Sequence, residues 1–222
     1  MNRFLLKISS TRKAFTLVEL LAVVAIVGIL SSIIIAVVGN VRQSADQTTC
    51  ASNLRELQLA SISYAAEQGY YVPSIINYEK GNGSIDRVYW YNNPIFLDHL
   101  GSEKQLRCPT HEYLKSDSPK AGNFSYGINF TNLEGGWSEP GIKRTATMVQ
   151  VENPVDTMAF ADGVDWQIAD WAADKYVAEE YIAHAIAYRH NGKANIVRFD
   201  GSVSAMYREE VVKNNDLWKI EQ

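Results

Sequence analysis

The N-terminal part of the chain carries two hydrophobic patterns in succession. From Phe15 to Val38 about 24 positions in a row are apolar, apart from one carboxylate, Glu19, and three hydroxyl side chains. A helix of that length rises roughly 36 Å, which is enough to cross a bilayer core of about 30 Å. The pattern therefore predicts a membrane-spanning helix over residues 15–38.

After this run the pattern becomes amphipathic without a break. Spacings of four and three residues place five side chains on one helix face: Cys50, Leu54, Leu57, Ser61 and Tyr64. Gly69 is placed to cap the helix, and Pro73 stands where it would stop. We therefore expect one long helix over residues 15–70, with its second half packed on a globular head.

From residue 71 to 222 the composition is typical of a mixed head with turns rich in Gly, Asn and Pro. The local patterns predict a loop at 77–86, a short helix at 94–100, and strands at 88–91, 126–130 and 157–163, the last ending in a turn at Gly163. Asn191-Gly192 and Asp200-Gly201 predict tight turns joining three antiparallel strands, 185–190, 193–199 and 202–207. Residues 164–182 fit either helix or loop. The expected fold is α+β, with the long N-terminal helix packed on an antiparallel β-sheet head.

Charge is divided unevenly along this arrangement. The first 14 residues carry four basic side chains and no acidic one, whereas the remainder carries 17 basic and 25 acidic residues, a net charge of −8. Basic flanks of a membrane helix stay in the cytoplasm, so we expect a cytoplasmic N-terminus and an extracytoplasmic, periplasmic head. An acidic body does not favour nucleic-acid binding, which needs a cationic surface.

The residues around the start of the apolar run resemble a type IV prepilin signal. The string is Arg12-Lys13-Ala14-Phe15-Thr16-Leu17-Val18-Glu19. The resemblance implies a pilin-like fold, removal of a leader at residues 1–14 by a prepilin peptidase that cuts between Ala14 and Phe15, and methylation of the new Phe15 amine. The residue before the cut is usually Gly in this family, and here it is Ala14. The alternatives are an ordinary secretory signal, whose apolar core is shorter, and a plain single-pass anchor.

Glu19 is a carboxylate in an apolar helix, which costs about 3 kcal/mol on insertion scales unless the group has a partner or a role. The family resemblance implies that Glu19 pairs with the free Phe15 amine of a neighbouring subunit during assembly. The alternative is that Glu19 lies near the cytoplasmic interface and reaches water there.

A second resemblance lies near the C-terminus. His190, nine residues and then Asp200-Gly201 resemble the H-x9-D-G motif of a large bacterial prepilin-like family. That family assigns the motif no settled chemistry, so it supports the resemblance more than any mechanism.

Cys50 and Cys108 are the two cysteines of the chain. Cys50 lies on the helix face expected to meet the head, and disulfides persist outside the cytoplasm. We expect a bridge between them, and two buried free thiols are the alternative.

The sequence offers little for metal binding or catalysis. His190 and Asp200 are expected at opposite ends of one strand, roughly 20 Å apart, so we expect no shared metal. Asp162 and Asp200 both precede glycine and are weak candidates for calcium. Cys108 and His111 lack the second ligand pair of a zinc site. Because no catalytic motif is present either, we expect no cofactor and no enzyme.

The leading hypothesis is a prepilin-like or pseudopilin subunit of a type IV pilus or a type II secretion-like pseudopilus. Its expected partners are the prepilin peptidase, other pilin or pseudopilin subunits and the inner-membrane assembly platform. Its expected location is the bacterial inner membrane as a single-pass protein, or a cell-surface filament. The alternative is a membrane-tethered extracytoplasmic binding protein that does not polymerise.

Overall fold

The computed structural model describes residues 16–111, 124–131, 133, 140–143, 145–178 and 180–220. The chain divides into two compact units, residues 1–42 and residues 43–222. Helix α1 (Leu17–Gln68) contributes to both units, so each part of the helix is described with its own unit. The expected start at Phe15 lies outside the described residues.

The end of α1 follows the turn chemistry expected from the sequence. Gly69 has a φ of +84°, in the left-handed region that glycine adopts without strain. Its N–H donates to the carbonyl of Ala65 at 2.9 Å, which closes the last helical turn. The predicted C-cap is therefore confirmed.

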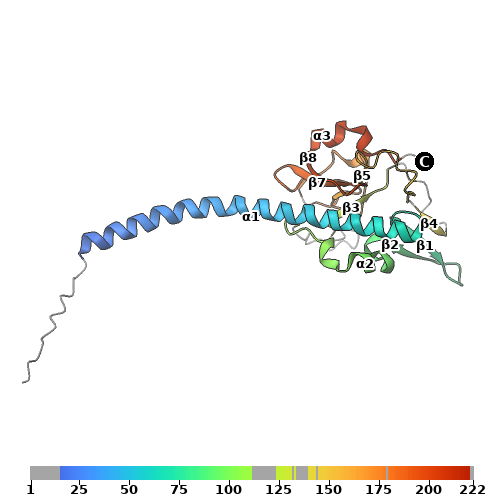
Figure 1. Cartoon of the computed structure of the whole chain (residues 1–222), viewed down its shortest axis with the longest axis horizontal. Helices are drawn as coiled ribbons and strands as arrows, with labels where there is room; N and C mark the ends of the chain where they lie inside the picture. The colour runs from blue at the N-terminus through green and yellow to red at the C-terminus, as the bar shows by residue number, and fades with distance from the viewer. Residues whose placement is uncertain are drawn as a thin grey trace, which may run out of the picture. The chain divides into compact units, whose positions relative to one another are not determined.

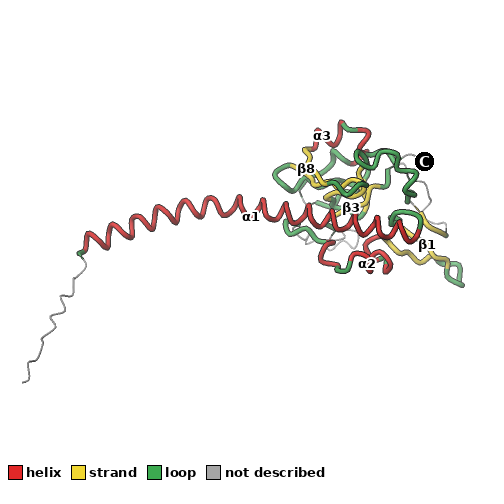
Figure 2. The backbone as a smooth tube through the Cα atoms, in the orientation of Figure 1, coloured by secondary structure: helices red, strands yellow, loops and turns green. Residues whose placement is uncertain are grey.

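The larger of two sheets in the second unit has five strands in the order β6-β3-β5-β7-β8 (Figures 1 and 2). The strands are β3 (Tyr126–Asn129), β5 (Met158–Asp162), β6 (Gln167–Ile168), β7 (Lys193–Arg198) and β8 (Val203–Tyr207). All neighbours are antiparallel except β3 and β6, which run parallel. The expected antiparallel head is therefore a mixed sheet at one edge.

The smaller sheet has the order β2-β1-β4 and consists of short strands. They are β1 (Ile75–Glu79), β2 (Ile85–Tyr89) and β4 (Gly141–Lys143). The prediction of a surface loop over 77–86 was wrong, because β1 and β2 form an antiparallel hairpin whose connection is only residues 80–84. Ile75 and Ile76 are buried, so packing of the first half of β1 overrides the turn-rich composition.

The described part of the second unit also contains two short helices. The predicted helix is confirmed as α2 (Pro94–Leu100), with Asn93 Oδ1 accepting from the N–H groups of Ile95 and Phe96. Helix α3 (Arg208–Lys213) follows β8 and was not expected. Four 3₁₀ turns lie at η1 (Trp90–Asn92), η2 (Glu103–Leu106), η3 (Asp170–Ala172) and η4 (Asn215–Leu217).

The second half of α1 presents the predicted face to the core of the head. Cys50, Leu54 and Leu57 are fully buried, and Ser61 and Tyr64 are each 1% exposed. The four of them other than Ser61 belong to one hydrophobic cluster together with side chains from α2 and from strands β3, β5 and β7. In Figure 1 this part of α1 runs between α2 and the five-stranded sheet. The head is thus built around residues 43–68 of its own helix.

The predicted three-stranded meander was wrong in its first strand. β7 pairs with β8 on one side and with β5 on the other, so β5 takes the place expected for residues 185–190. Those residues are buried but irregular, with isolated bridges at Ile186 and His190. The turn itself is present, because Asn191 and Gly192 both have positive φ.

Candidate functional site

The beginning of α1 is held by a reciprocal contact between Thr16 and Glu19. Glu19 Oε2 accepts from the N–H of Thr16 at 2.8 Å and from its hydroxyl at 2.9 Å. The N–H of Glu19 in turn donates to Thr16 Oγ1 at 3.2 Å. This is a capping box, in which two otherwise unpaired backbone donors are satisfied at once. Sequence reasoning missed it, although Thr-x-x-Glu ahead of an apolar run is its signature.

The described side chains in the apolar part of α1 are exposed. Within the described residues from Leu17 to Val41, every large hydrophobic side chain is at least 52% exposed. Of the helices in the described part of the chain, α1 is the one long and apolar enough to cross a membrane. Ala14 and Phe15, the residues expected at the processing site, lie outside the described residues.

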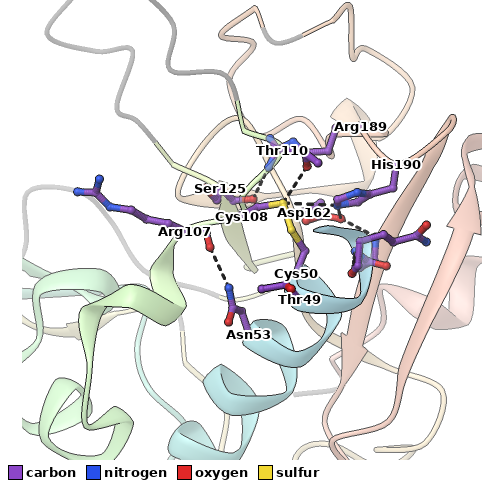
Figure 3. The surroundings of a disulfide bond; sticks show 12 residues. Thr49, Cys50, Asn53, Arg107, Cys108, Thr110, Ser125, Asp162, Arg189 and His190 are labelled. Carbon is purple, nitrogen blue, oxygen red and sulfur yellow. Dashed lines mark hydrogen bonds and ion pairs between the residues drawn. A yellow bond between two sulfur atoms is a disulfide. The ribbon is translucent and has the colours of Figure 1, made fainter. Parts of the chain in front are cut away.

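The second cluster of interest surrounds a disulfide in the head. Cys50 on α1 and Cys108, two residues after η2, are joined with their Cα atoms 5.0 Å apart (Figure 3). Asn53, one turn along α1, donates from Nδ2 to the carbonyl of Arg107 at 2.8 Å. The bond and this contact tie α1 to the segment that carries Cys108.

Tyr126 of β3 packs on the same turn of α1. Its hydroxyl lies 3.5 Å from the carbonyl of Cys50 and accepts from Asn53 Nδ2 at 3.3 Å. Tyr126 is 1% exposed, and this burial raises the pKa of its hydroxyl well above the ordinary value. The phenol therefore stays neutral and serves as a hydrogen-bonding group in the wall of the disulfide site.

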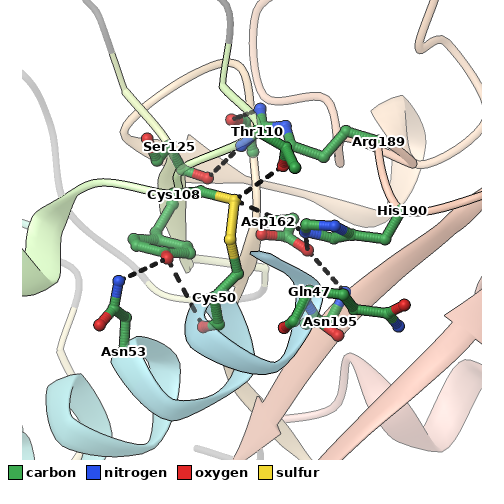
Figure 4. A network of polar contacts seen from close by, with 12 residues as sticks. Gln47, Cys50, Asn53, Cys108, Thr110, Ser125, Asp162, Arg189, His190 and Asn195 are labelled. Atoms are coloured by element: carbon green, nitrogen blue, oxygen red, sulfur yellow. Dashed lines mark hydrogen bonds and ion pairs between the residues drawn. A yellow bond between two sulfur atoms is a disulfide. The ribbon is translucent and has the colours of Figure 1, made fainter. Parts of the chain in front are cut away.

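His190 lies beside this disulfide, in contact with a residue that the motif does not contain. His190 Nε2 is 3.2 Å from Asp162 Oδ2 and 3.6 Å from Cys108 Sγ (Figure 4). Asp162 ends β5, and its Oδ2 also accepts from the N–H of Asn195 on β7 at 2.7 Å. His190 and Asp162 are both fully buried. The motif histidine is therefore part of a polar network shared by β5, β7 and the disulfide.

Arg189 closes the far side of this network. Its guanidinium donates to the carbonyl of Ser125 at 2.9 Å and to that of Gly163 at 2.8 Å. These carbonyls lie just before β3 and just after β5, so Arg189 fixes the two chain segments beside which His190 is placed. Local sequence patterns did not indicate this arrangement, since it depends on the pairing of β3 with β5.

The other motif residues lie elsewhere. Asp200 accepts from the N–H of Ser202 at 2.9 Å, and Gly201 has a φ of +85°, so they shape the turn between β7 and β8. His190 and Asp200 are thus at the two ends of β7. Asp162 lies opposite Asn195, roughly 16 Å along the strand from Asp200. The structure does not bring the two calcium candidates together.

A separate buried carboxylate lies in the segment that follows β5. Asp165 is 2% exposed; its Oδ2 accepts from the N–H of His184 at 3.0 Å and lies 3.3 Å from His184 Nδ1. Burial raises the pKa of Asp165 above its ordinary value, and the contacts with His184 act in the opposite direction. The group connects the start of the 164–182 segment with His184, two residues beyond its end.

Two tryptophans, Trp166 and Trp171, lie in the 164–182 segment. Trp166 is partly buried against Tyr89, at 4.8 Å between ring centroids, and its carbonyl accepts from Trp90 Nε1 at 2.7 Å. Trp171 is 53% exposed and lies edge-on to Phe130. The first therefore packs in the head, and the second is largely at its surface.

A long apolar N-terminal helix followed by a β-sheet head defines a pilin-like α+β fold. Residues 9–35 match the family model described as the prokaryotic N-terminal methylation motif. The chain is therefore prepilin-like in its N-terminal region. No curated protein and no solved structure matches the chain. The match does not reach His190 or Asp200, so the resemblance seen there stays a prediction.

Proposed function

We propose that this protein is a structural subunit that assembles into a type IV pilus or a type II secretion-like pseudopilus. The observation that carries the proposal is the position of the methylation motif, residues 9–35, at the start of an exposed apolar helix. In this proposal the head lies outside the cytoplasm and the leader lies in the cytoplasm, in keeping with the basic charge of the leader. The proposal assigns the protein no catalytic role.

Processing is the first step of the proposed mechanism. A prepilin peptidase cuts between Ala14 and Phe15, removes residues 1–14 and leaves a free amine on Phe15 that becomes methylated. Removal of four basic side chains also removes the charge that holds the N-terminus at the cytoplasmic face. The helix can then leave the bilayer as a filament grows on the inner-membrane assembly platform.

Lateral packing of α1 is the second step. Exposed apolar side chains on all sides of a helix require an apolar environment. The membrane supplies it for the single subunit, and the α1 helices of other subunits supply it in the filament. The head needs no such partner for its own core, because the core-facing side chains of residues 43–68 are already buried within the second unit.

Glu19 sets the register of neighbouring helices in this proposal. Both hydrogen bonds from Thr16 go to Oε2, so we assign Oε1 to the Phe15 amine of the next subunit. A carboxylate and an ammonium buried together cost far less than either one alone. The capping contact orients the carboxylate along its own helix before the neighbour arrives.

Two substitutions at Glu19 distinguish the contribution of its charge to assembly from that of its capping contact. Glu19→Gln keeps a side chain that can complete a capping box but has no charge, whereas Glu19→Ala loses both. We expect both variants to insert in the membrane and both to fail to enter filaments, measured by immunoblotting of sheared surface material and of membranes. Thr16→Val, which breaks the cap and keeps the carboxylate, is the matched control and should still assemble. Normal filaments from Glu19→Gln would refute charge pairing.

The mature N-terminus distinguishes this proposal from the non-polymerising tether. Mass spectrometry of the membrane protein should find a chain that begins with N-methyl-Phe15. An intact leader on all of the protein, with no filaments in sheared material, would favour a membrane-tethered binding protein instead.

A further inference from the structure

Four metal-ligating side chains from four different segments meet in the interior of the head. They are the two disulfide cysteines, Cys50 and Cys108, together with His190 and Asp162 (Figure 4). The ligand atoms of the two cysteines and the histidine all lie within 4.8 Å of one another. Cys108 is 4% exposed, and the other three residues are fully buried. Thiolate sulfur, imidazole nitrogen and carboxylate oxygen are all ligands that zinc accepts in proteins.

The distances between these donors fit a tetrahedral zinc ion. Zn–S bonds of about 2.3 Å and Zn–N bonds of about 2.05 Å imply about 3.6 Å between sulfur and nitrogen ligands. The observed distance from Cys108 Sγ to His190 Nε2 is 3.6 Å. A nitrogen and a carboxylate oxygen on one zinc ion lie about 3.3 Å apart, and His190 Nε2 is 3.2 Å from Asp162 Oδ2. Two edges of the tetrahedron are therefore already present.

The edge between the two sulfurs is the one that differs. The two sulfurs are covalently bonded in the disulfide, whereas two sulfurs on one zinc ion are separate and about 3.8 Å apart. Reduction of the bond makes that change by itself, because two thiols can approach no closer than van der Waals contact. The donors are thus arranged for a metal in the reduced protein and for a covalent bond in the oxidised one.

Neighbouring groups are placed to support ligands in both states. The N–H of Asn195 donates to Asp162 Oδ2 at 2.7 Å, which orients the carboxylate. Thr110 Oγ1 lies 3.0 Å from Cys108 Sγ, where its hydroxyl can donate to a thiolate. Outer hydrogen bonds of this kind fix ligand orientation and raise metal affinity.

We propose that the reduced protein binds one Zn²⁺ through Cys50, Cys108 and His190, with Asp162 as the fourth ligand, and that disulfide formation expels it. A dithiol reductant gives two electrons and two protons to the disulfide, which becomes two thiols, while the reductant becomes a disulfide. Zinc then displaces the two thiol protons to solvent and binds the Nε2 lone pair of neutral His190, whose one ring proton is then on Nδ1. In the reverse direction, a small-molecule disulfide takes two electrons from the zinc-bound thiolates and two protons from solvent, becomes two thiols, and leaves the Cys50–Cys108 bond and free Zn²⁺. The site would hold α1 on the head before the covalent bond forms.

The test is a metal titration of the full chain in detergent micelles, reduced anaerobically with a phosphine. Co²⁺ is the probe, because tetrahedral cobalt with thiolate ligands gives strong visible absorption and a sulfur-to-cobalt charge-transfer band. We expect one equivalent of Co²⁺ to bind, Zn²⁺ to displace it, and oxidised glutathione to release the zinc. The untreated, disulfide-bonded protein should bind neither metal. Absence of the cobalt spectrum in the reduced wild-type protein would overturn the proposal.

Substitution of the histidine tests the site itself. His190→Gln should weaken zinc binding by more than about 10-fold, the least that loss of a supporting residue costs. His99→Gln is the matched control, because His99 is a half-buried histidine that pairs with Glu67 at 3.2 Å. Equal affinities for the two variants would contradict the proposal.

If His190→Gln does not fold, X-ray absorption at the zinc edge identifies the ligands of zinc bound to the reduced wild-type protein. Two sulfur and two nitrogen or oxygen ligands support the site. Four sulfur ligands, which would need two chains, or ligation by nitrogen and oxygen alone would refute it.

Discussion

The two parts of α1 have the same backbone conformation and obtain their stability from different sources. Up to Arg42 the described large hydrophobic side chains are at least half exposed. From Gln43 onward one face of the helix is buried in the head by the same chain. The first part thus has no apolar packing partner within the described chain, whereas the second part packs against its own head. Helical conformation by itself therefore says nothing about where a segment finds its packing partners.

This comparison can be tested selectively, because all five tryptophans lie after residue 43. Their fluorescence in detergent micelles reports unfolding of the second unit and is blind to the apolar part of α1. With urea as denaturant, this fluorescence therefore measures the free energy of unfolding of the second unit alone.

Loss of the disulfide should have the largest effect. Cys50 and Cys108 are 58 positions apart, and the chain-entropy estimate for a loop of that length is about 4 kcal/mol. The Cys50→Ala/Cys108→Ala protein should lose roughly that free energy of unfolding relative to the oxidised wild type. A midpoint unchanged from that of the wild type would mean that α1 is held to the head by packing alone.

Truncation of a buried leucine on α1 should cost somewhat less. Leu57 is fully buried and Leu59, two residues on, is 47% exposed. Leu57→Ala should lower the free energy of unfolding by about 3 kcal/mol, because it leaves a cavity as well as removing apolar contacts. Leu59→Ala is the control and should cost less than about 1 kcal/mol. Similar losses in the two variants would contradict the assigned helix face.

Glycine-to-alanine substitutions distinguish a glycine that is closely packed from one with free space around its Cα atom. A Cβ on Gly127 of β3 would lie 2.6 Å from Ile168 Cγ2 and 2.8 Å from the carbonyl of Asp165, whereas one on Gly28 of α1 meets nothing within 4 Å. Gly127→Ala should destabilise the head by about 2 kcal/mol through overpacking. Gly28→Ala should leave the tryptophan-detected midpoint unchanged. A shift of that midpoint in Gly28→Ala would contradict the inference that the apolar part of α1 does not contribute to the stability of the head.

The smallest expected effect concerns pH. Burial raises the native pKa of Asp165 above the value of about 3.9 that it has when unfolded. The folded state then binds this proton more tightly, so its stabilisation is present below pH 3.9 and is lost as the pH rises through the native pKa. In Asp165→Asn, the free energy of unfolding should therefore fall less steeply as the pH rises from about 3.9 through the native pKa of Asp165. Asp170→Asn, at an exposed site in the same segment, should retain the wild-type slope; an equal change in both variants would argue against burial as the cause.

The sequence predicted the long helix and its buried face because both follow from periodicity within one segment. Cys50, Leu54 and Leu57 lie on a single stripe, and a local pattern is enough to place them. The same reasoning failed at residues 185–190. A tight turn at Asn191-Gly192 shows that the chain reverses, and it does not show that the preceding segment pairs in a sheet.

By itself, then, the sequence determined the apolar helix, the methylation motif, the cap at Gly69 and the class of fold, since each depends on residues close together in the chain. Only the tertiary structure decided that β5 lies beside β7, and hence that Asp162 faces His190 while Asp200 lies at the far end of the strand. Strand pairing depends on competition between distant segments for the same edge, and local patterns do not record its outcome. For that reason the meeting of Asp162, His190 and the disulfide is visible only in the folded head.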